Sequence, residues 1–137
     1  MTAWPNGSNT MPRVSSPYGP RPGVGYSNFH EGVDFADYTD IFSVFPGVVS
    51  WAGYFNANAG HAVCYRPDGF GNSVEILHFH IASGSPAVSK GQRISAGRKL
   101  ARMGQTGNAT GPCDHFEIRV NGRHVDPIAW MIANGAA

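Results

Sequence analysis

The 137-residue sequence has few charged residues and few cysteines, and it contains no long apolar run. Ten basic residues stand against nine acidic ones and are scattered, so a basic face for nucleic acid is not expected. Two cysteines, Cys64 and Cys113, are too few for a disulfide framework, although they could form a single bridge with each other. No apolar segment approaches the roughly 20 residues of a membrane-spanning helix, so we expect no membrane insertion.

The N-terminus also lacks features that would mark a targeting segment. Residues 1–13 contain neither a basic start nor an apolar stretch, so no signal peptide is recognised. Their polar composition indicates a flexible arm at 1–13, followed by one domain at 14–137. We expect this domain to be a monomer.

What the sequence does have is glycine and proline in abundance, spread along the whole chain. That distribution is typical of many short strands joined by turns. Alternating apolar and polar residues predict strands, most clearly at 29–36, 73–82 and 114–120. Residues 54–60 are expected to be a loop, and one short helical turn is expected within 125–132. The predicted fold is all-β, an antiparallel sandwich or barrel-like core with little helix, whose short loops form a groove.

His30 and Asp34 are the first candidate metal ligands. They are four residues apart, and this even spacing puts both on one face of an extended strand. An imidazole and a carboxylate suit Zn²⁺ in a three-ligand site with an open fourth position. Taken alone, the pair fits a surface histidine and a turn aspartate better than a metal site.

His78 and His80 form a second candidate cluster. Alternation along a strand predicts that both face one side while Phe79 packs on the other. Two such imidazoles could bind a metal or move protons, or they could simply lie on an exposed strand face.

Cys113 and His115 form a third candidate cluster. They should share a face, while Phe116 points into the core and Glu117 turns toward His115. The preceding glycine-rich loop at 103–112 lets backbone approach a ligand closely. The alternative is a satisfied histidine near a turn.

Taken together, these segments resemble one family. FHEGVDFA at 29–36 looks like the first zinc motif of lysostaphin/LytM-type metallopeptidases. ILHFHIAS at 76–83 is similar to the family strand that carries a catalytic histidine. MGQTGNATGPCDHFEIRVNG at 103–122 resembles the family's glycine loop, which runs into its His-x-His motif. The order and combination of the motifs make this resemblance specific, and it covers nearly all of the chain after residue 13.

The resemblance implies a zinc peptidase site with named residues. His30, Asp34 and His115 would be the metal ligands, and the fourth position would be left for water. His80 would be a catalytic histidine beside that water. Substrate would lie in a groove for which Tyr26, Tyr54 and Phe55 are candidate walls, although ordinary turn and core packing explains these aromatic residues equally well.

Two positions depart from the family pattern. Cys113 stands where the family has a second catalytic histidine, and His78 stands where it has a tyrosine. Cys113 could be a weak hydrogen-bond donor, or it could bind zinc as a thiolate and inhibit the enzyme. His78 could supply the missing imidazole if it faces the site with His80.

The resemblance implies hydrolysis of peptide bonds in bacterial peptidoglycan, and hence action on the cell wall. Without a recognised signal peptide, we expect a phage lysin released through a membrane lesion or carried in the virion. The alternative function is a zinc-binding module that binds or regulates the wall, weakened or inactive because of Cys113.

Overall fold

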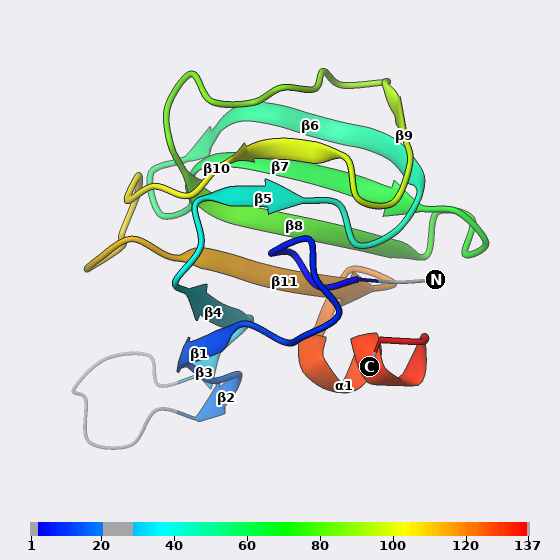
Figure 1. The fold of residues 1–137 in the computed structure, drawn as a ribbon, viewed down its shortest axis with the longest axis horizontal. Coiled ribbons are helices and arrows are strands. Elements are labelled where there is room, and N and C mark those ends of the chain that lie inside the picture. The colour runs from blue at the N-terminus through cyan, green and yellow to red at the C-terminus, as the bar shows by residue number, and fades with distance from the viewer. Residues whose placement is uncertain (1–2, 21–28, 137) are drawn as a thin grey trace.

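The computed structural model describes residues 3–20 and 29–136, and its dominant element is one large antiparallel sheet (Figure 1). Its strands lie side by side in the order β1 (Arg13–Ser16), β4 (Val33–Ala36), β11 (Asp114–Val120), β8 (Val74–Ile81), β7 (Gly60–Pro67), β6 (Gly47–Asn56) and β9 (Arg93–Ile94). A short strand, β12 (Arg123–Val125), pairs with β11 through the turn at Asn121 and Gly122.

A smaller sheet forms a second layer. It pairs β5 (Asp40–Phe42) with β10 (Lys99–Arg102), and Figure 1 shows it in front of the large sheet. A further pair joins β2 (Gly19–Pro20) to β3 (Phe29–His30). In the described residues the one helix is α1 (Pro127–Ala133), which Asp126 caps by accepting hydrogen bonds from the first-turn amides. The expected all-β fold with little helix is confirmed.

The hydrophobic core fills the space between these layers. Phe35, Ile76 and Phe116 from the large sheet are fully buried in one cluster with Ile41 and Leu100 from the small sheet. Burial of such side chains contributes about 2 kcal/mol each to stability. The apolar residues that alternate along β8 and β11 therefore fix which face of the large sheet points inward.

The N-terminal segment, expected to be a flexible arm, packs against this core in its described part. Trp4 is 1% exposed and packs edge-on against Phe35. The backbone amide of Phe42 donates to the carbonyl of Pro5, which fastens the segment to β5. One large aromatic side chain outweighs the polar residues around it, because its burial stabilises the fold more than exposed polar contacts do.

The opposite face of the large sheet carries a smaller apolar cluster that includes Ala62, Cys64, Leu77 and Phe79. These residues alternate with the inward-facing ones, so the cluster lies on the outer face. The cysteines Cys64 and Cys113 are both free thiols, so the possible bridge between them is not formed.

Strand β6 is longer than expected. The segment 54–60 was predicted to be a loop, but the strand continues to Asn56 and β7 begins at Gly60. The side-chain oxygen of Asn56 accepts a hydrogen bond from the amide of Ala59 and closes the tight turn between them. Over residues 3–20 and 29–136, no helix has the length and apolarity needed to cross a membrane.

Candidate metal centre

His30, Asp34 and His115 converge at one point on the outer face of the large sheet. The Nδ1 atom of His115 lies 2.8 Å from Oδ1 of Asp34, and Nε2 of His30 lies 3.2 Å from each of those two atoms. His115 and Asp34 are directly opposite each other in the pairing of β11 with β4. Strand register therefore unites ligands that are far apart in the sequence.

The spacing of these three atoms fits a small divalent metal ion. Donors placed about 2.0–2.1 Å from a tetrahedral zinc would lie roughly 3.3 Å from one another, close to the separations found here. In the described residues, this is the one group of three or more histidine, cysteine or carboxylate side chains with metal-ligand spacing. Two imidazoles and one carboxylate are also a donor set that zinc enzymes use.

Hydrogen bonds on the far side of each imidazole orient its lone pair toward that point. Nδ1 of His30 donates to the carbonyl of Pro17 at 2.8 Å, which leaves Nε2 as the ligand atom. Nε2 of His115 donates to Oε1 of Glu117 at 3.0 Å, which leaves Nδ1 as the ligand atom. Such outer partners hold ring orientation in metal sites. The expected turn of Glu117 toward His115 is confirmed.

The ionisable side chains of the centre shift one another's pKa values. Burial alone would lower the pKa of His115, but hydrogen bonds with Asp34 and Glu117 outweigh it and raise that pKa to about 9. Burial raises the pKa of Asp34, and hydrogen bonds from the two histidines outweigh it, so the net shift is downward. The cluster therefore holds a proton when no cation is bound, and a cation would take its place.

Gly32 is required by the close approach of β11. A Cβ atom at this position would lie 2.7 Å from the carbonyl oxygen of Phe116 and 2.8 Å from Nε2 of His115. Any side chain would therefore push the His115 ring out of place.

His80 lies next to the three ligands, with its ring centroid 5.7 Å from that of His115. Its Nδ1 atom donates to the carbonyl of Thr106 at 2.7 Å, which leaves Nε2 unprotonated. Burial is the main cause that lowers the pKa of His80, so the ring is neutral near pH 7. A neutral imidazole held in this way can accept a proton.

Cys113 lines the same groove but does not belong to the ligand group. Burial, followed by the nearby charges of Asp34 and Asp114, raises the pKa of its thiol to about 12. At neutral pH the group is therefore a thiol rather than a thiolate. The position of the sulfur outside the ligand group favours the weak-donor alternative over sulfur as a fourth ligand.

The prediction that His78 shares a face with His80 is wrong. His78 is completely buried on the core side, where its ring stacks on Tyr65 and contacts Phe116. The backbone of His80 has a positive φ of 62°, and the pairing of β7 with β8 is irregular nearby. That irregularity interrupts alternation, so His78 cannot supply the missing imidazole.

The ligands open onto a groove of about 880 Å³. Phe55 is one of its walls, as expected, and its ring lies 5.2 Å from that of Phe79. Tyr54 was also expected there, but it is 57% exposed and packs on His61 outside the groove lining. The third candidate wall, Tyr26, lies outside the described residues.

Three features in or beside the groove were missed by the sequence reasoning. Phe79 was assigned to the opposite face, Phe29 was read only as a strand residue, and Thr106 was one residue of a glycine-rich loop. The hydroxyl of Thr106 donates to the carbonyl of Ile81 and accepts from the amide of His61. A threonine among glycines was the available signal for such a bridging role.

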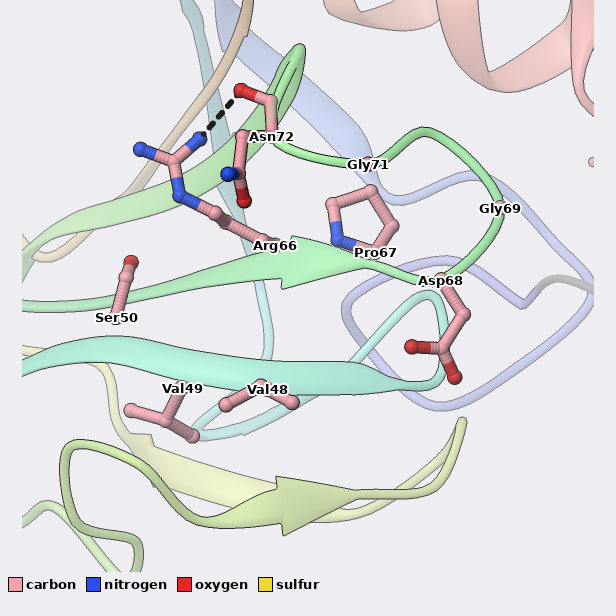
Figure 2. Close-up of a pocket in the computed structure, with 9 residues that line it drawn as sticks. All are labelled: Val48, Val49, Ser50, Arg66, Pro67, Asp68, Gly69, Gly71 and Asn72. Atoms are coloured by element: carbon pink, nitrogen blue, oxygen red, sulfur yellow. Dashed lines mark hydrogen bonds between the residues drawn. The ribbon is translucent and has the colours of Figure 1, made fainter.

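A second hollow of about 350 Å³ lies at the other end of β6 and β7 (Figure 2). Val48, Pro67 and Arg66 line it, and the Arg66 guanidinium donates to the carbonyl of Asn72. Its one acidic residue, Asp68, is already paired with Arg93. The residues in this hollow do not form a metal-ligand or nucleophile cluster, so the chemistry is concentrated in the groove.

Comparison with known families gives one match over most of the chain. Residues 28–127 match the model of Peptidase family M23. This range contains all three candidate ligands and His80.

Individual relatives agree with that match. The chain is 33% identical over 120 residues to the peptidoglycan DD-endopeptidase ShyC of Vibrio cholerae, covering 84% of this chain and 26% of ShyC. The chain spans 24–26% of the length of the first curated relatives it matches.

Solved structures agree as well. The catalytic domain of the prophage-encoded M23 protein EnpA from Enterococcus faecalis, as an A109H mutant, superposes with a TM-score of 0.71 at 31% identity, covering 84% of this chain and 88% of that one. The catalytic domain of lysostaphin from Staphylococcus simulans gives a TM-score of 0.76 at 25% identity, with coverages of 88% and 92%.

Proposed function

This chain belongs to peptidase family M23, and from that membership we propose that it is a zinc-dependent endopeptidase cleaving peptide bonds of bacterial peptidoglycan. One observation carries the proposal. Three ligand atoms from His30, Asp34 and His115 lie within 2.8–3.2 Å of one another at an open groove, with the His80 imidazole beside them. A relative named as a peptidoglycan DD-endopeptidase supports the substrate class.

The three ligands would hold the ion through Nε2 of His30, Oδ1 of Asp34 and Nδ1 of His115. When bound, zinc would polarise a peptide carbonyl and make water more acidic. His80 would accept the proton of the attacking water at Nε2, since its Nδ1 is committed to Thr106. The same imidazole could then give that proton to the leaving amine.

The groove explains why an extended peptide is the fitting substrate. Its walls are the side chains of Phe29 and Phe55, and its floor includes Phe79 and the ligand His115. The loop at 108–113 contributes Ala109, Gly111 and other small residues to the rim, which leaves room for a backbone. Cross-links of peptidoglycan consist largely of small residues, so their backbone could approach the centre closely.

Cys113 favours a second candidate, a wall-binding module with a weakened site. Its neutral thiol lines the groove at a position where the resemblance implies an imidazole. Loss of one donor to a developing oxyanion lowers the rate by about two to three orders of magnitude. A slow enzyme is therefore the favoured form of this candidate, since the ligand group is complete.

The test is cleavage of purified cell walls of several peptide types. The expected result is loss of turbidity that a chelator stops and that added zinc restores, with new peptide termini identified by mass spectrometry. Asp34→Ala should abolish cleavage, whereas His61→Ala, which alters a histidine outside the ligand group, should preserve it. If the protein binds walls but produces no new peptide termini, the endopeptidase proposal fails and the wall-binding module is the function that remains.

Delivery by a phage and a monomeric state are further proposals. The resemblance to a prophage-encoded M23 protein supports the first. Light scattering of the purified chain tests the second, with a single species of monomer mass as the expected result.

A further inference from the structure

Directly behind the metal centre, a chain of buried hydrogen bonds crosses the core. The Tyr38 hydroxyl donates to Oδ2 of Asp114 at 2.6 Å, and Nδ1 of His78 lies 3.0 Å from Oδ1 of the same carboxylate. Nε2 of His78 lies 3.2 Å from the Tyr65 hydroxyl, which accepts from the amide of Val44 at 3.0 Å. His78, Asp114 and Tyr65 have no exposed surface.

One arrangement of protons satisfies every member of this chain. In it Tyr65 donates to Nε2 of His78, and the Nδ1 proton of His78 and the Tyr38 hydroxyl proton are both directed at the side chain of Asp114. A buried carboxylate that lost one of these donors would carry an unsatisfied oxygen. The position of Asp114 is therefore tightly specified by its two partners.

Three members, Asp114, His78 and Tyr38, lie in or just after a strand that also carries a group of the metal centre. Asp114 stands between Cys113 and the ligand His115 in β11, while His78 is in β8 with His80. Adjacent strand residues point to opposite faces, so the chain of hydrogen bonds lies behind the groove.

The third segment follows β4, which carries the ligand Asp34. Tyr38 comes shortly after the end of that strand, beyond the positive-φ residue Asp37. Its hydroxyl thus ties the segment after Asp34 to the residue next to His115. The bond therefore joins the two strands that carry Asp34 and His115, β4 and β11.

We propose that Tyr38, Asp114 and His78 form a positioning network that fixes β11 against β4 and β8, so that His115 meets Asp34 and His80 at the metal centre. The inference rests on the proposed function only in naming the ion as zinc. Packing alone gives no reason for a carboxylate here, because apolar residues of similar volume commonly serve a buried position equally well or better.

The first test is Tyr38→Phe, which removes a single hydroxyl and keeps the ring. Zinc affinity, measured by competition with a chromophoric chelator, should fall by about tenfold. The matched control is Ser43→Ala, which also removes a buried hydroxyl but one that bonds to Ser95 and Arg98 away from the groove. The control should lose stability in thermal unfolding while its zinc affinity stays within twofold of wild type.

A second pair of variants tests whether Asp114 positions the ligand-bearing strands or only fills space in the core. Asp114→Asn keeps an oxygen for Tyr38 but loses the acceptor for Nδ1 of His78, so its zinc affinity should fall, though less than in Asp114→Ala, which should lose more than tenfold. Thermal unfolding without zinc verifies that each protein is folded. If Tyr38→Phe binds zinc as tightly as Ser43→Ala, or if Asp114→Ala remains folded and binds like wild type, the network is packing only and the proposal is overturned.

Zinc affinity is independent of whether walls are cleaved. If the wild-type protein cuts no wall, the proposed function is wrong, but the zinc affinities of the variants still test the positioning network. If the wild type does cut, kcat should fall in Tyr38→Phe while KM stays within twofold, because the groove walls are untouched.

Discussion

The imidazole of His115 lies flat against the ring of Phe79, with centroids 5.4 Å apart and planes 8° from parallel. The two residues are direct partners in the pairing of β11 with β8. This stacking covers one face of a ligand ring and leaves Nδ1 directed at Asp34. Phe79 therefore restricts rotation of the His115 ring, while the hydrogen bond to Glu117 fixes its tautomer.

Replacing Phe79 with leucine should test that restriction. Leucine fills most of the volume but cannot stack, so we expect a loss of about 1 kcal/mol in the free energy of unfolding. Zinc affinity should fall several-fold, as measured by chelator competition. Phe55→Leu is the control, since Phe55 contacts Phe79 but not the ligand; equal losses in both variants would contradict the prediction.

The sequence predicted the parts of the site that depend on local pattern. His30 and Asp34 do come together, but the expectation that they share one face of a single strand is wrong, because a bend at 31–32 divides 29–36 into β3 and β4. The alternation of β11 correctly placed Phe116 inside and Glu117 beside His115. The three candidate ligands do converge, and zinc binding by them stays a prediction. Regular alternation carried this information, because side-chain direction in a strand has a period of two.

The parts that were missed depend on irregular backbone or distant contacts. The positive φ at His80 reversed the expected faces of His78 and Phe79. Trp4 was assigned to a loose arm because its partner, Phe35, is far away in the sequence. A pattern within one segment cannot reveal a bulge or a tertiary partner, since both are set by neighbouring strands.

Gly32→Ala should damage the metal centre more than the fold. The added methyl would collide with the Phe116 carbonyl and with the His115 ring, so we expect zinc affinity to fall at least tenfold. Gly111→Ala is the matched glycine control, because a methyl there meets no atom within 4 Å. Unchanged zinc affinity in Gly32→Ala would contradict the prediction, because it would show that β11 can move away from the added methyl group while His115 keeps its place in the metal centre.

Zinc should stabilise the folded chain through its three ligands. A free concentration 1,000 times the Kd adds about 4 kcal/mol, which raises Tm by on the order of 10 °C for a domain of this size. Calorimetry with zinc and with a chelator measures the shift. His30→Ala should remove most of it and His124→Ala, outside the ligand group, should keep it; a shift that survives in His30→Ala would place the ion elsewhere.

The alkylation rate of Cys113 should depend on pH in an unusual way. Only the thiolate reacts, and burial together with the charges of Asp34 and Asp114 raises the pKa to about 12. At pH 8 roughly one thiol in ten thousand is then ionised. Because pH stays below the pKa, the rate should rise about tenfold per pH unit from 8 to 10, whereas an ordinary thiol would level off near pH 9.

Mass spectrometry of iodoacetamide-treated protein can follow both cysteines at once. Cys64 has no exposed surface, so it should stay unmodified until the chain unfolds. A Cys113 rate that levels off below pH 9 in the metal-free protein would show that its thiolate is stabilised, which would revive sulfur as a fourth ligand.

Cys113→His should increase peptidase activity. The thiol lines the groove beside the centre, at the position where the family resemblance implies a second catalytic imidazole. A positioned imidazole commonly contributes about 10²–10⁴-fold to proton transfer, so we expect kcat to rise at least tenfold with KM nearly unchanged. Cys113→Ser is the size-matched control: because Cys113 is a neutral thiol outside the ligand group, removing its sulfur should leave kcat within about threefold of the wild type. A serine variant as active as the histidine variant would mean that the sulfur atom itself inhibits the wild type, and the weak-donor role of Cys113 would then be wrong.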